Sequence, residues 1–169
     1  QHAAPPFITS TLQQAAGGRL RFSARQTMQI AQQLYEGVDL GAEGATGLIT
    51  YMRTDSVAVA KEAQQNAREF IASHYGPEYV PDKPNAYRSR QSAQGAHEAI
   101  RPTDVNRTPQ QMAHFLDGRQ LKLYTLIWNR FVACQMASAQ LSEHSIDVRA
   151  IPSAEPLATG KLAHDYLFR

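Results

Sequence analysis

The first 40 residues carry apolar side chains at helical spacing, behind polar residues that can cap a helix. One set recurs every three or four residues: Met28, Ala31, Leu34 with Tyr35, and Val38. Ser23 precedes this set and Gln26 follows Ser23 by three residues, which is the signature of a capping box. Because Gly37 falls in the last turn, the pattern predicts a helix that ends near Tyr35–Glu36.

A shorter helix is predicted just before it, over Thr11–Ala16. Ser10 and Gln13 repeat the capping signature, and Gly17–Gly18 is expected to end the helix. Two short helices joined by a glycine-containing turn resemble a helix-turn-helix. Three arginines crowd the turn and the start of the second helix: Arg19, Arg21 and Arg25. They could contact phosphates, because a helix N-terminus favours anions, or form a solvated basic turn, and the pattern leaves both open.

Three more helices are predicted between residues 56 and 135. The first starts near Ser56 and ends at Tyr75-Gly76-Pro77, with one apolar face: Ala60, Ala63, Ala67, Phe70 and Ile71. The second starts at Thr108-Pro-Gln-Gln111, where threonine caps the helix and proline takes its first position. Asp117-Gly118 interrupts, and the third follows with an apolar stripe that we expect in the core: Leu121, Tyr124, Ile127, Trp128, Phe131 and Val132.

The rest of the chain is predicted to be loop or strand. Residues 37–47 are glycine-rich and residues 76–95 are proline-rich, so both are expected to be irregular. Residues 145–151, "SIDVRAI", alternate apolar and polar side chains, which indicates a strand. The predicted organisation is a helical domain over 1–140, followed over 141–169 by the first strands of a truncated β-rich domain.

Composition narrows the function only a little. The 169 residues are 43% hydrophobic and 19% charged, which fits one folded domain, or one domain with part of a second. A formal net charge of +2 is compatible with a nucleic-acid partner without requiring one. The single cysteine, Cys134, excludes an intrachain disulfide and a thiolate metal cluster. No apolar run is long enough to cross a bilayer.

Residues 47–56, "GLITYMRTDS", place a phenol two residues before a guanidinium. In an extended segment Ile49, Tyr51 and Arg53 share one side, while Leu48, Thr50 and Met52 take the other. The backbones of Tyr51 and Arg53 would then lie about 7 Å apart, a spacing that suits one anion between the two side chains. Arginine is the residue that grips phosphate oxygens with two hydrogen bonds.

A phenol, with an ordinary pKa of about 10, becomes a good nucleophile only when its anion is stabilised. A neighbouring cation does this, and so does a helix N-terminus, which we expect Thr54-Asp55-Ser56 to cap. Most tyrosines, however, are half-buried packing residues with a satisfied hydroxyl. Spacing alone therefore leaves Tyr51 between a catalytic and a packing role.

Residues 94–102, "QGAHEAIRP", form a second group of interest. If they are helical, His97 and Arg101 lie four residues apart on one face and could hold a phosphodiester. Glu98 could instead pair with Arg101 in a local salt bridge. The other histidines and the scattered acidic residues show no spacing typical of metal ligands, so no metal site is predicted.

Five segments occur in an order that resembles the type IA DNA topoisomerases of bacteria. They are "PFITSTLQQAA", "TMQIAQQLYEG", "GLITYMRTDS", "AHEAIRPTDV" and "LYTLIWNRFVACQM". The resemblance runs from Pro6 to about residue 140. One departure is Gly95, where many members carry an acidic residue. The resemblance implies a mainly α fold: a helical nucleophile domain with helix-turn-helix (CAP-like) elements, followed by the start of a β-rich arch domain.

The resemblance also implies a chemistry. Tyr51 would attack a phosphodiester of single-stranded DNA to form a transient 5′-phosphotyrosine, which allows strand passage and relaxes negative supercoils without ATP. Arg53 would hold the reacting phosphate, and His97 and Arg101 would contact the DNA backbone, with Arg25 a further candidate contact. The family's Mg²⁺ site and general acid lie on a separate N-terminal domain, and nothing in this sequence resembles it.

The chain is therefore interpreted as an internal fragment of a larger enzyme, weak or inactive alone. Its expected partners are single-stranded DNA and the enzyme's other domains, with no membrane and a monomeric state, in the cytoplasm with the nucleoid. The alternative is a non-catalytic helix-turn-helix DNA-binding module in which Tyr51 only packs. A recombinase-like tyrosine enzyme is disfavoured, because such sites surround the tyrosine with several distant basic residues.

Overall fold

The computed structural model describes residues 3–87, 97–140, 142–146, 148–149 and 167–168. The chain divides into two units, Gln1–Ala139 and Gln140–Arg169. In the described part of the second unit, β3 (Val148–Arg149) pairs antiparallel with β4 (Leu167–Phe168). The strand predicted over 145–151 is therefore observed for two residues, while Ile146 just before it is 80% exposed.

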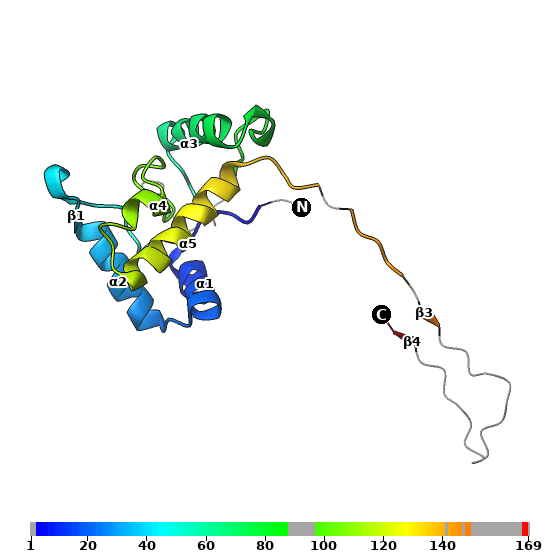
Figure 1. Ribbon diagram of the computed structural model, residues 1–169, viewed down its shortest axis with the longest axis horizontal. Helices are drawn as coiled ribbons and strands as arrows, with labels where there is room; N and C mark the ends of the chain where they lie inside the picture. The colour runs from blue at the N-terminus through cyan, green and yellow to red at the C-terminus, as the bar shows by residue number, and fades with distance from the viewer. Residues whose placement is uncertain (1–2, 88–96, 141, 147, 150–166, 169) are drawn as a thin grey trace, which may run out of the picture. The chain divides into compact units, whose positions relative to one another are not determined.

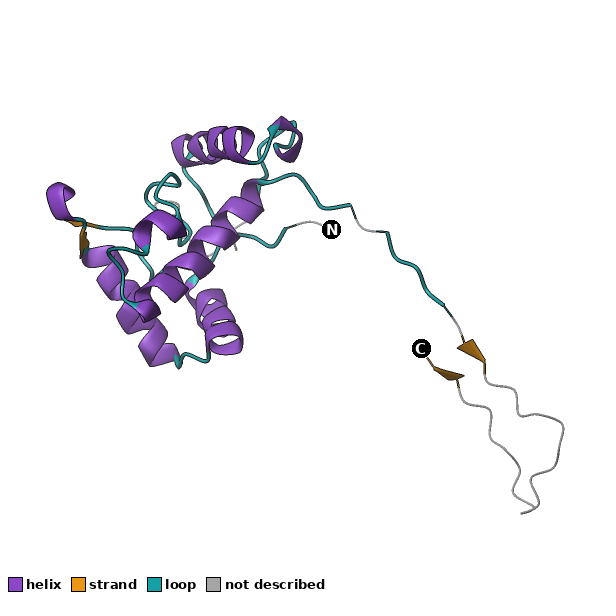
Figure 2. Cartoon of the chain, in the orientation of Figure 1, coloured by secondary structure: helices purple, strands orange, loops and turns teal. Residues whose placement is uncertain are grey.

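The first unit is helical, as Figures 1 and 2 show, so the predicted mainly α fold is confirmed. Its helices in the described residues are α1 (Thr9–Leu20), α2 (Ala24–Glu36), α3 (Lys61–His74), α4 (Pro109–Met112) and α5 (Gly118–Gln135). A two-stranded hairpin joins β1 (Val38–Asp39) to β2 (Ala45–Thr46). Short 3-10 turns occupy Gly41–Glu43 and Pro77–Tyr79. None of these helices is long and apolar enough to cross a membrane.

Helix α5 is the centre of the unit and contacts the other four helices (Figure 1). It begins where predicted, because the Asp117 carboxylate accepts hydrogen bonds from the main-chain N–H groups of Arg119 (2.7 Å) and Gln120 (2.8 Å). The predicted apolar stripe is buried except for Leu121. In all, nine residues of the helix are buried: Leu123, Tyr124, Leu126, Ile127, Trp128, Phe131, Val132, Cys134 and Gln135. The core of the unit is thus built around this helix.

Two other predicted helix starts are confirmed by their caps. The Ser23 hydroxyl accepts a hydrogen bond from the Gln26 N–H (3.1 Å) at the start of α2. The Thr108 hydroxyl accepts from the Gln111 N–H (3.4 Å), and the Gln111 side chain accepts in return from the Thr108 N–H (3.0 Å). Helix α2 ends at Gly37, whose φ of 127° is open to glycine and costly for other residues.

The prediction for α1 was wrong at both ends. The helix starts at Thr9 rather than after Ser10, and it passes through Gly17–Gly18 to Leu20. Glycine inside a helix costs about 1 kcal/mol each relative to alanine, and the burial of Leu12 and Ala16 in the core favours the helix against that cost. The helix ends where Arg21 turns to a φ of 61° and the Phe22 N–H bonds back to the Ala16 carbonyl (3.3 Å).

The prediction for the start of α3 was also wrong. The helix begins at Lys61, five residues after Ser56, and its cap residue Ala60 has no side-chain cap. The hydroxyls of Thr54 and Ser56 instead accept hydrogen bonds two residues ahead, from the N–H groups of Ser56 (3.0 Å) and Ala58 (3.1 Å). Such local bonds compete with helix formation and keep this stretch extended. The predicted end of α3 is confirmed at Tyr75–Gly76.

Two predicted loops differ in their outcome. Residues 37–47 contain the β1–β2 hairpin and its 3-10 tip, which the glycine content did not predict because each strand has only two residues. Residues 76–95 are irregular after the 3-10 turn Pro77–Tyr79 as far as residue 87, and their remainder lies outside the described residues. The Asn85 side chain donates hydrogen bonds to the carbonyls of Cys134 (3.0 Å) and Met136 (2.8 Å), which fastens this loop to the end of α5.

We predict that the Cys134 thiol is protected from thiol reagents while the chain is folded. The side chain is fully buried, and this burial raises its pKa to about 12, so little thiolate exists near neutral pH. Labelling of this thiol with a disulfide reagent at pH 8 should be slow in buffer. In concentrated guanidinium chloride, where the chain is unfolded, one equivalent of thiol should react at once. Rapid labelling in buffer would contradict the buried position.

Candidate active site

Residues 48–58 form an extended segment that is hydrogen-bonded to three other parts of the chain. The Leu48 N–H donates to the Leu34 carbonyl of α2 (2.7 Å), and the Thr50 N–H donates to the Arg101 carbonyl (2.9 Å). The Thr9 N–H at the start of α1 donates to the Thr54 carbonyl (2.9 Å). The segment is therefore held by α1, by α2 and by residues 99–103.

Burial alternates along this segment. Met52, Thr54 and Ser56 are buried, whereas Tyr51, Arg53 and Asp55 are exposed. The predicted placement of Tyr51 and Arg53 on the open side and Met52 on the core side is therefore observed, although the chain bends at 52–53. Ile49 departs from its predicted side: only 1% of it is exposed, since it lies where the chain bridges to Pro102.

Two threonine hydroxyls fix the backbone around Tyr51. The Thr9 hydroxyl donates to the Met52 carbonyl (2.8 Å) and accepts from the Thr54 N–H (2.9 Å). The Thr50 hydroxyl donates to the Ala99 carbonyl (2.7 Å) and accepts from the Arg101 N–H (3.0 Å). Each hydroxyl uses both its donor and its acceptor capacity, so both sides of Tyr51 are anchored.

The Tyr51 ring lies against a second exposed tyrosine. The ring centroids of Tyr35 and Tyr51 are 5.3 Å apart in an edge-to-face arrangement, and the two residues are 41% and 47% exposed. Together with Thr50, Thr54, His97 and Glu98 they line a hollow of about 310 Å³. The structure thus brings Tyr51 and His97, predicted from separate segments, to one hollow.

Gly47 sets how closely the segment approaches α2. A Cβ atom at this position would lie 2.7 Å from the Tyr35 carbonyl oxygen, closer than Cβ atoms approach such an oxygen in real structures. The Thr103 hydroxyl donates to the Gly47 carbonyl from the other side (2.8 Å). Glycine is therefore required here for close packing of two backbones.

Arg53 lines two hollows next to that of Tyr51. One, of about 460 Å³, also contains His97 and the first residues of α1: Ile8, Thr9, Ser10 and Gln13. The other, of about 940 Å³, runs along α2 and contains Arg25 and Arg119. Arg53 and Tyr51 line different ones of the three hollows described here, but His97 and Thr54 line both the Tyr51 hollow and the smaller Arg53 hollow.

The helix N-terminus at this site belongs to α1, not to the helix predicted after Tyr51. Thr54-Asp55-Ser56 caps no helix, because α3 begins at Lys61. Helix α1 has no acidic residue in its first turn, and that turn lies in the hollow with Arg53 and His97. Its main-chain N–H groups and the arginine both favour an anion.

Arg101 is engaged with its neighbours. Residues 97–102 are not helical, because Ile100 bridges to Phe7 and Pro102 bridges to Ile49. The predicted helical face shared by His97 and Arg101 was therefore wrong. The Arg101 guanidinium instead bonds to the Glu98 carboxylate (2.6 and 2.9 Å) and to the Pro102 carbonyl (3.0 Å), which is the local salt bridge considered from the sequence. His97 itself is exposed.

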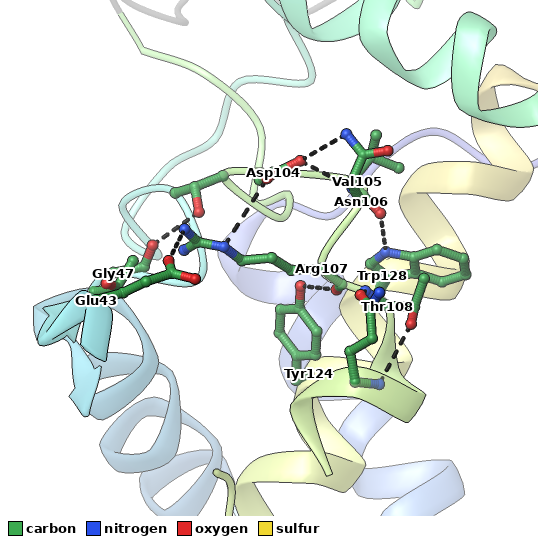
Figure 3. Close-up of polar contacts among 12 residues, drawn as sticks. Glu43, Gly47, Asp104, Val105, Asn106, Arg107, Thr108, Tyr124 and Trp128 are labelled. Carbon is green, nitrogen blue, oxygen red and sulfur yellow. Dashed lines mark hydrogen bonds and ion pairs between the residues drawn. The ribbon is translucent and has the colours of Figure 1, made fainter. Parts of the chain in front are cut away.

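A polar network connects residues 103–108 to α5 and to the hairpin (Figure 3). The Tyr124 hydroxyl donates to the Arg107 carbonyl (2.6 Å), and the Trp128 ring N–H donates to the Val105 carbonyl (2.9 Å). Burial raises the pKa of Tyr124, and the Asp104 carboxylate adds to this. The Arg107 guanidinium pairs with Glu43 at 2.8 Å. The central helix thereby positions the stretch that supports Tyr51.

Tyr35, Thr9 and Thr50 are the residues of this site that the sequence did not identify. Tyr35 was assigned to the apolar face of α2, and threonine is too common for its hydroxyl to be singled out. Their roles depend on contacts with residues 16 to 51 positions away along the chain. Local patterns carry no signal for such contacts.

A protein-family profile described as "DNA topoisomerase" matches residues 1–163. The chain belongs to the bacterial type IA DNA topoisomerase family. DNA topoisomerase 1 of Campylobacter jejuni is 56% identical over 146 residues, which are 86% of this chain and 21% of that protein. DNA topoisomerase 1 of Xylella fastidiosa is 55% identical over 148 residues, which are 87% of this chain and 18% of that protein.

The fold agrees with this assignment. The solved structure of full-length topoisomerase I from Thermotoga maritima superposes with a TM-score of 0.68 at 50% identity, over 80% of this chain and 21% of that one. This topoisomerase chain thus spans about a fifth of the length of its relatives. The family uses Mg²⁺. Among the described residues no group of three or more His, Cys, Asp or Glu could hold a metal ion.

We predict that Thr9→Val lowers the free energy of unfolding by about 1–3 kcal/mol, since it leaves a main-chain N–H and a carbonyl without their partner. Chemical denaturation would measure the loss, and amide hydrogen exchange at Thr54 should accelerate. Thr46→Val is the matched control, because the Thr46 hydroxyl has only one long bond, to Gly44 (3.3 Å) within the hairpin. Equal stability of the two variants would show that Thr9 does not anchor the segment.

Proposed function

We propose that Tyr51 is the nucleophile that cleaves single-stranded DNA in this topoisomerase. The observation that carries the proposal is an exposed tyrosine, on a segment anchored from both sides, in a hollow that shares His97 with the hollow of Arg53 and the α1 N-terminus. Family membership supplies DNA as the substrate class.

In the proposed step the Tyr51 oxygen attacks phosphorus as its proton leaves. A bond forms between that oxygen and the phosphorus, and the bond to the 3′ oxygen of the preceding nucleotide breaks. This yields a 5′-phosphotyrosine and, once the departing oxygen has gained a proton, a free 3′ hydroxyl. Because one phosphodiester replaces another, the reverse attack reseals the strand without ATP. Passage of a strand through the break would relax negative supercoils.

Arg53 is proposed to bind the reacting phosphate with the N-terminus of α1. A guanidinium and main-chain N–H groups stabilise the charge that develops on the phosphoryl oxygens in the transition state. His97, exposed between the two hollows, is proposed to contact the neighbouring backbone. Arg25 is proposed as a more distant contact in the groove it shares with Arg53.

Arg101 is a proposed DNA contact of a different kind. Its guanidinium is paired with Glu98, whose other carboxylate oxygen accepts a hydrogen bond from the Ala60 N–H (3.1 Å). A phosphate would therefore have to share or replace that carboxylate. The pairing also holds residues 97–101 next to the segment of Tyr51, so Arg101 contributes to the shape of the site in either case.

The remaining parts of the activity are proposed to come from the rest of the enzyme. Mg²⁺ and the acid that protonates the 3′ oxygen are assigned to a separate domain, and residues 140–169 to the start of a β-rich one. On this proposal the 169-residue chain is monomeric and is weak or inactive by itself, while the complete enzyme acts on DNA in the cytoplasm. A non-catalytic DNA-binding role, with Tyr51 only packed, is disfavoured by the 47% exposure of that residue.

We predict that Tyr51→Phe abolishes the covalent adduct with a labelled single-stranded oligonucleotide, because the nucleophilic oxygen is removed. The assay mixes this chain with the separately made Mg²⁺-binding domain and detects the adduct on a denaturing gel. Tyr75→Phe is the matched control, since Tyr75 is 46% exposed at the end of α3 and lines none of the hollows described. We expect Tyr51→Phe to bind the oligonucleotide as the unaltered chain does but to form no adduct. An adduct that persists in Tyr51→Phe would refute the assignment of Tyr51 as the nucleophile.

We predict that Arg53→Ala slows adduct formation by about 10²-fold, the usual effect of removing one donor to a transition-state oxyanion. Arg53→Lys should recover only part of this rate, because lysine keeps the charge but loses the two-pronged hydrogen bond. Arg19→Lys serves as the control, since Arg19 lines a separate hollow with Arg130. A rate in Arg53→Ala equal to that of the unaltered chain would remove Arg53 from the reaction.

A further inference from the structure

A hollow of about 940 Å³ in the described part of the chain runs along α2. We name it the α2 groove; eleven residues line it: Arg25, Gln26, Met28, Gln29, Ile30, Gln32, Gln33, Glu36, Arg53, Asp117 and Arg119. Tyr35 places the end of α2 against Tyr51, and Arg25 lies ten residues earlier, about 15 Å back along the helix axis. We propose that the α2 groove binds the backbone of single-stranded DNA leading away from the cleavage site, with Arg119 as a phosphate contact.

The first argument is the state of the charges. Three guanidiniums line the groove, and among the described residues none has a carboxylate within ion-pair distance. The two carboxylates in the groove already have partners. Glu36 accepts from the Gln32 side chain, and Asp117 accepts from the two N–H groups at the start of α5. The arginines are thus free to bind an anion.

The second argument is the position of Arg119. It is exposed on the first turn of α5, and the neighbouring Gln120 side chain donates to the Gln33 side chain of α2 (3.3 Å). This contact brings the start of α5 to the last turn of α2, which forms one end of the groove wall. Arg119 and Arg25 therefore reach the groove from different helices, and Arg53 reaches it from the segment of Tyr51. An extended polyanion could meet all three.

The third argument is the chemistry of the other lining residues. Four glutamines offer amide donors and acceptors along α2, and none of the described residues that line the groove is aromatic. The rings of Tyr35 and Tyr51 lie in a different hollow. Bases would therefore stack near the cleavage site, while the groove would hold phosphate and sugar. Such contacts position a strand and carry little sequence preference.

This inference rests on the proposed function, because it assumes that DNA reaches Tyr51. Its test is binding rather than cleavage. The affinity of the 169-residue chain for a fluorescein-labelled oligothymidine of about 15 nucleotides would be measured by anisotropy over a range of salt concentrations. Arg119→Ala should weaken binding about fivefold at low salt and reduce the slope of log affinity against log salt by about 0.7, the loss of one phosphate contact on a single strand.

Two further variants make the result specific. Arg119→Lys should keep most of the salt slope, because the charge remains. Lys83→Ala removes one positive charge from the exposed stretch near Asn85, which is bonded to the opposite end of α5, and should leave affinity and slope unchanged. Circular dichroism melting would verify that each variant is folded.

The outcomes separate this inference from the proposed function. If Arg119→Ala binds like the unaltered chain, or if Lys83→Ala weakens binding equally, the α2 groove is not the path of the strand, even when Tyr51→Phe still abolishes the adduct. If the unaltered chain shows no binding at low salt, the groove proposal is overturned as well. Loss of binding in Arg119→Ala with an adduct that persists in Tyr51→Phe would support the groove and overturn the nucleophile.

Discussion

The site depends on the hydrogen bonds that hold residues 48–58 extended between α1, α2 and residues 99–103. An extended stretch outside a sheet has main-chain groups that need partners, and here threonine hydroxyls and distant carbonyls supply them. The Thr9 hydroxyl replaces what a neighbouring strand would provide at residues 52–54. Side chains then alternate between core and surface, and this alternation turns Tyr51 and Arg53 outward over a packed Met52.

Helix α5 stabilises that arrangement from the core side. Its residues Tyr124 and Trp128 combine apolar burial with one polar atom each, and those atoms bind the carbonyls of Arg107 and Val105. Residues 105–107 are thereby fixed to α5, and they closely follow residues 99–103, which bond to the segment of Tyr51. The outer surface of the segment is not packed against the core. Cationic side chains and a helix N-terminus lie on this surface. Stability and proposed chemistry are carried by opposite faces of one stretch of chain.

Much of the fold was predictable because its signals are local. Caps at Ser23, Thr108 and Asp117 act over three residues, and the sequence located all three helix starts. Alternation in residues 48–53 likewise identified Tyr51 and Arg53 as facing outward, although it placed the buried Ile49 on the same side. Errors arose where tertiary contacts outweighed local preference. Core packing carried α1 through Gly17–Gly18, and hydroxyl bonds within residues 54–58 delayed α3 until Lys61.

The candidate site was predictable only in its members, not in its geometry. Tyr51, Arg53 and His97 were named from short strings, but the helix N-terminus beside them proved to be that of α1, more than 40 residues earlier in the chain. Arg101 was expected on a helical face with His97, and bridges at Ile100 and Pro102 make that stretch extended instead. Pairings between distant segments decide such geometry, and a single sequence does not encode them in readable form.

The close approach at Gly47 has a consequence for how the chain can vary. The backbone leaves α2 at Gly37 and returns at Gly47 and Leu48, where it is pinned against the carbonyls of Tyr35 and Leu34. The hairpin between Gly37 and Gly47 therefore begins and ends at one fixed place beside the end of α2. Its tip is tied down mainly by an ion pair with an exposed carboxylate, which is a weak restraint. Insertions or deletions at that tip would therefore leave the positions of Gly47 and of the segment after it unchanged.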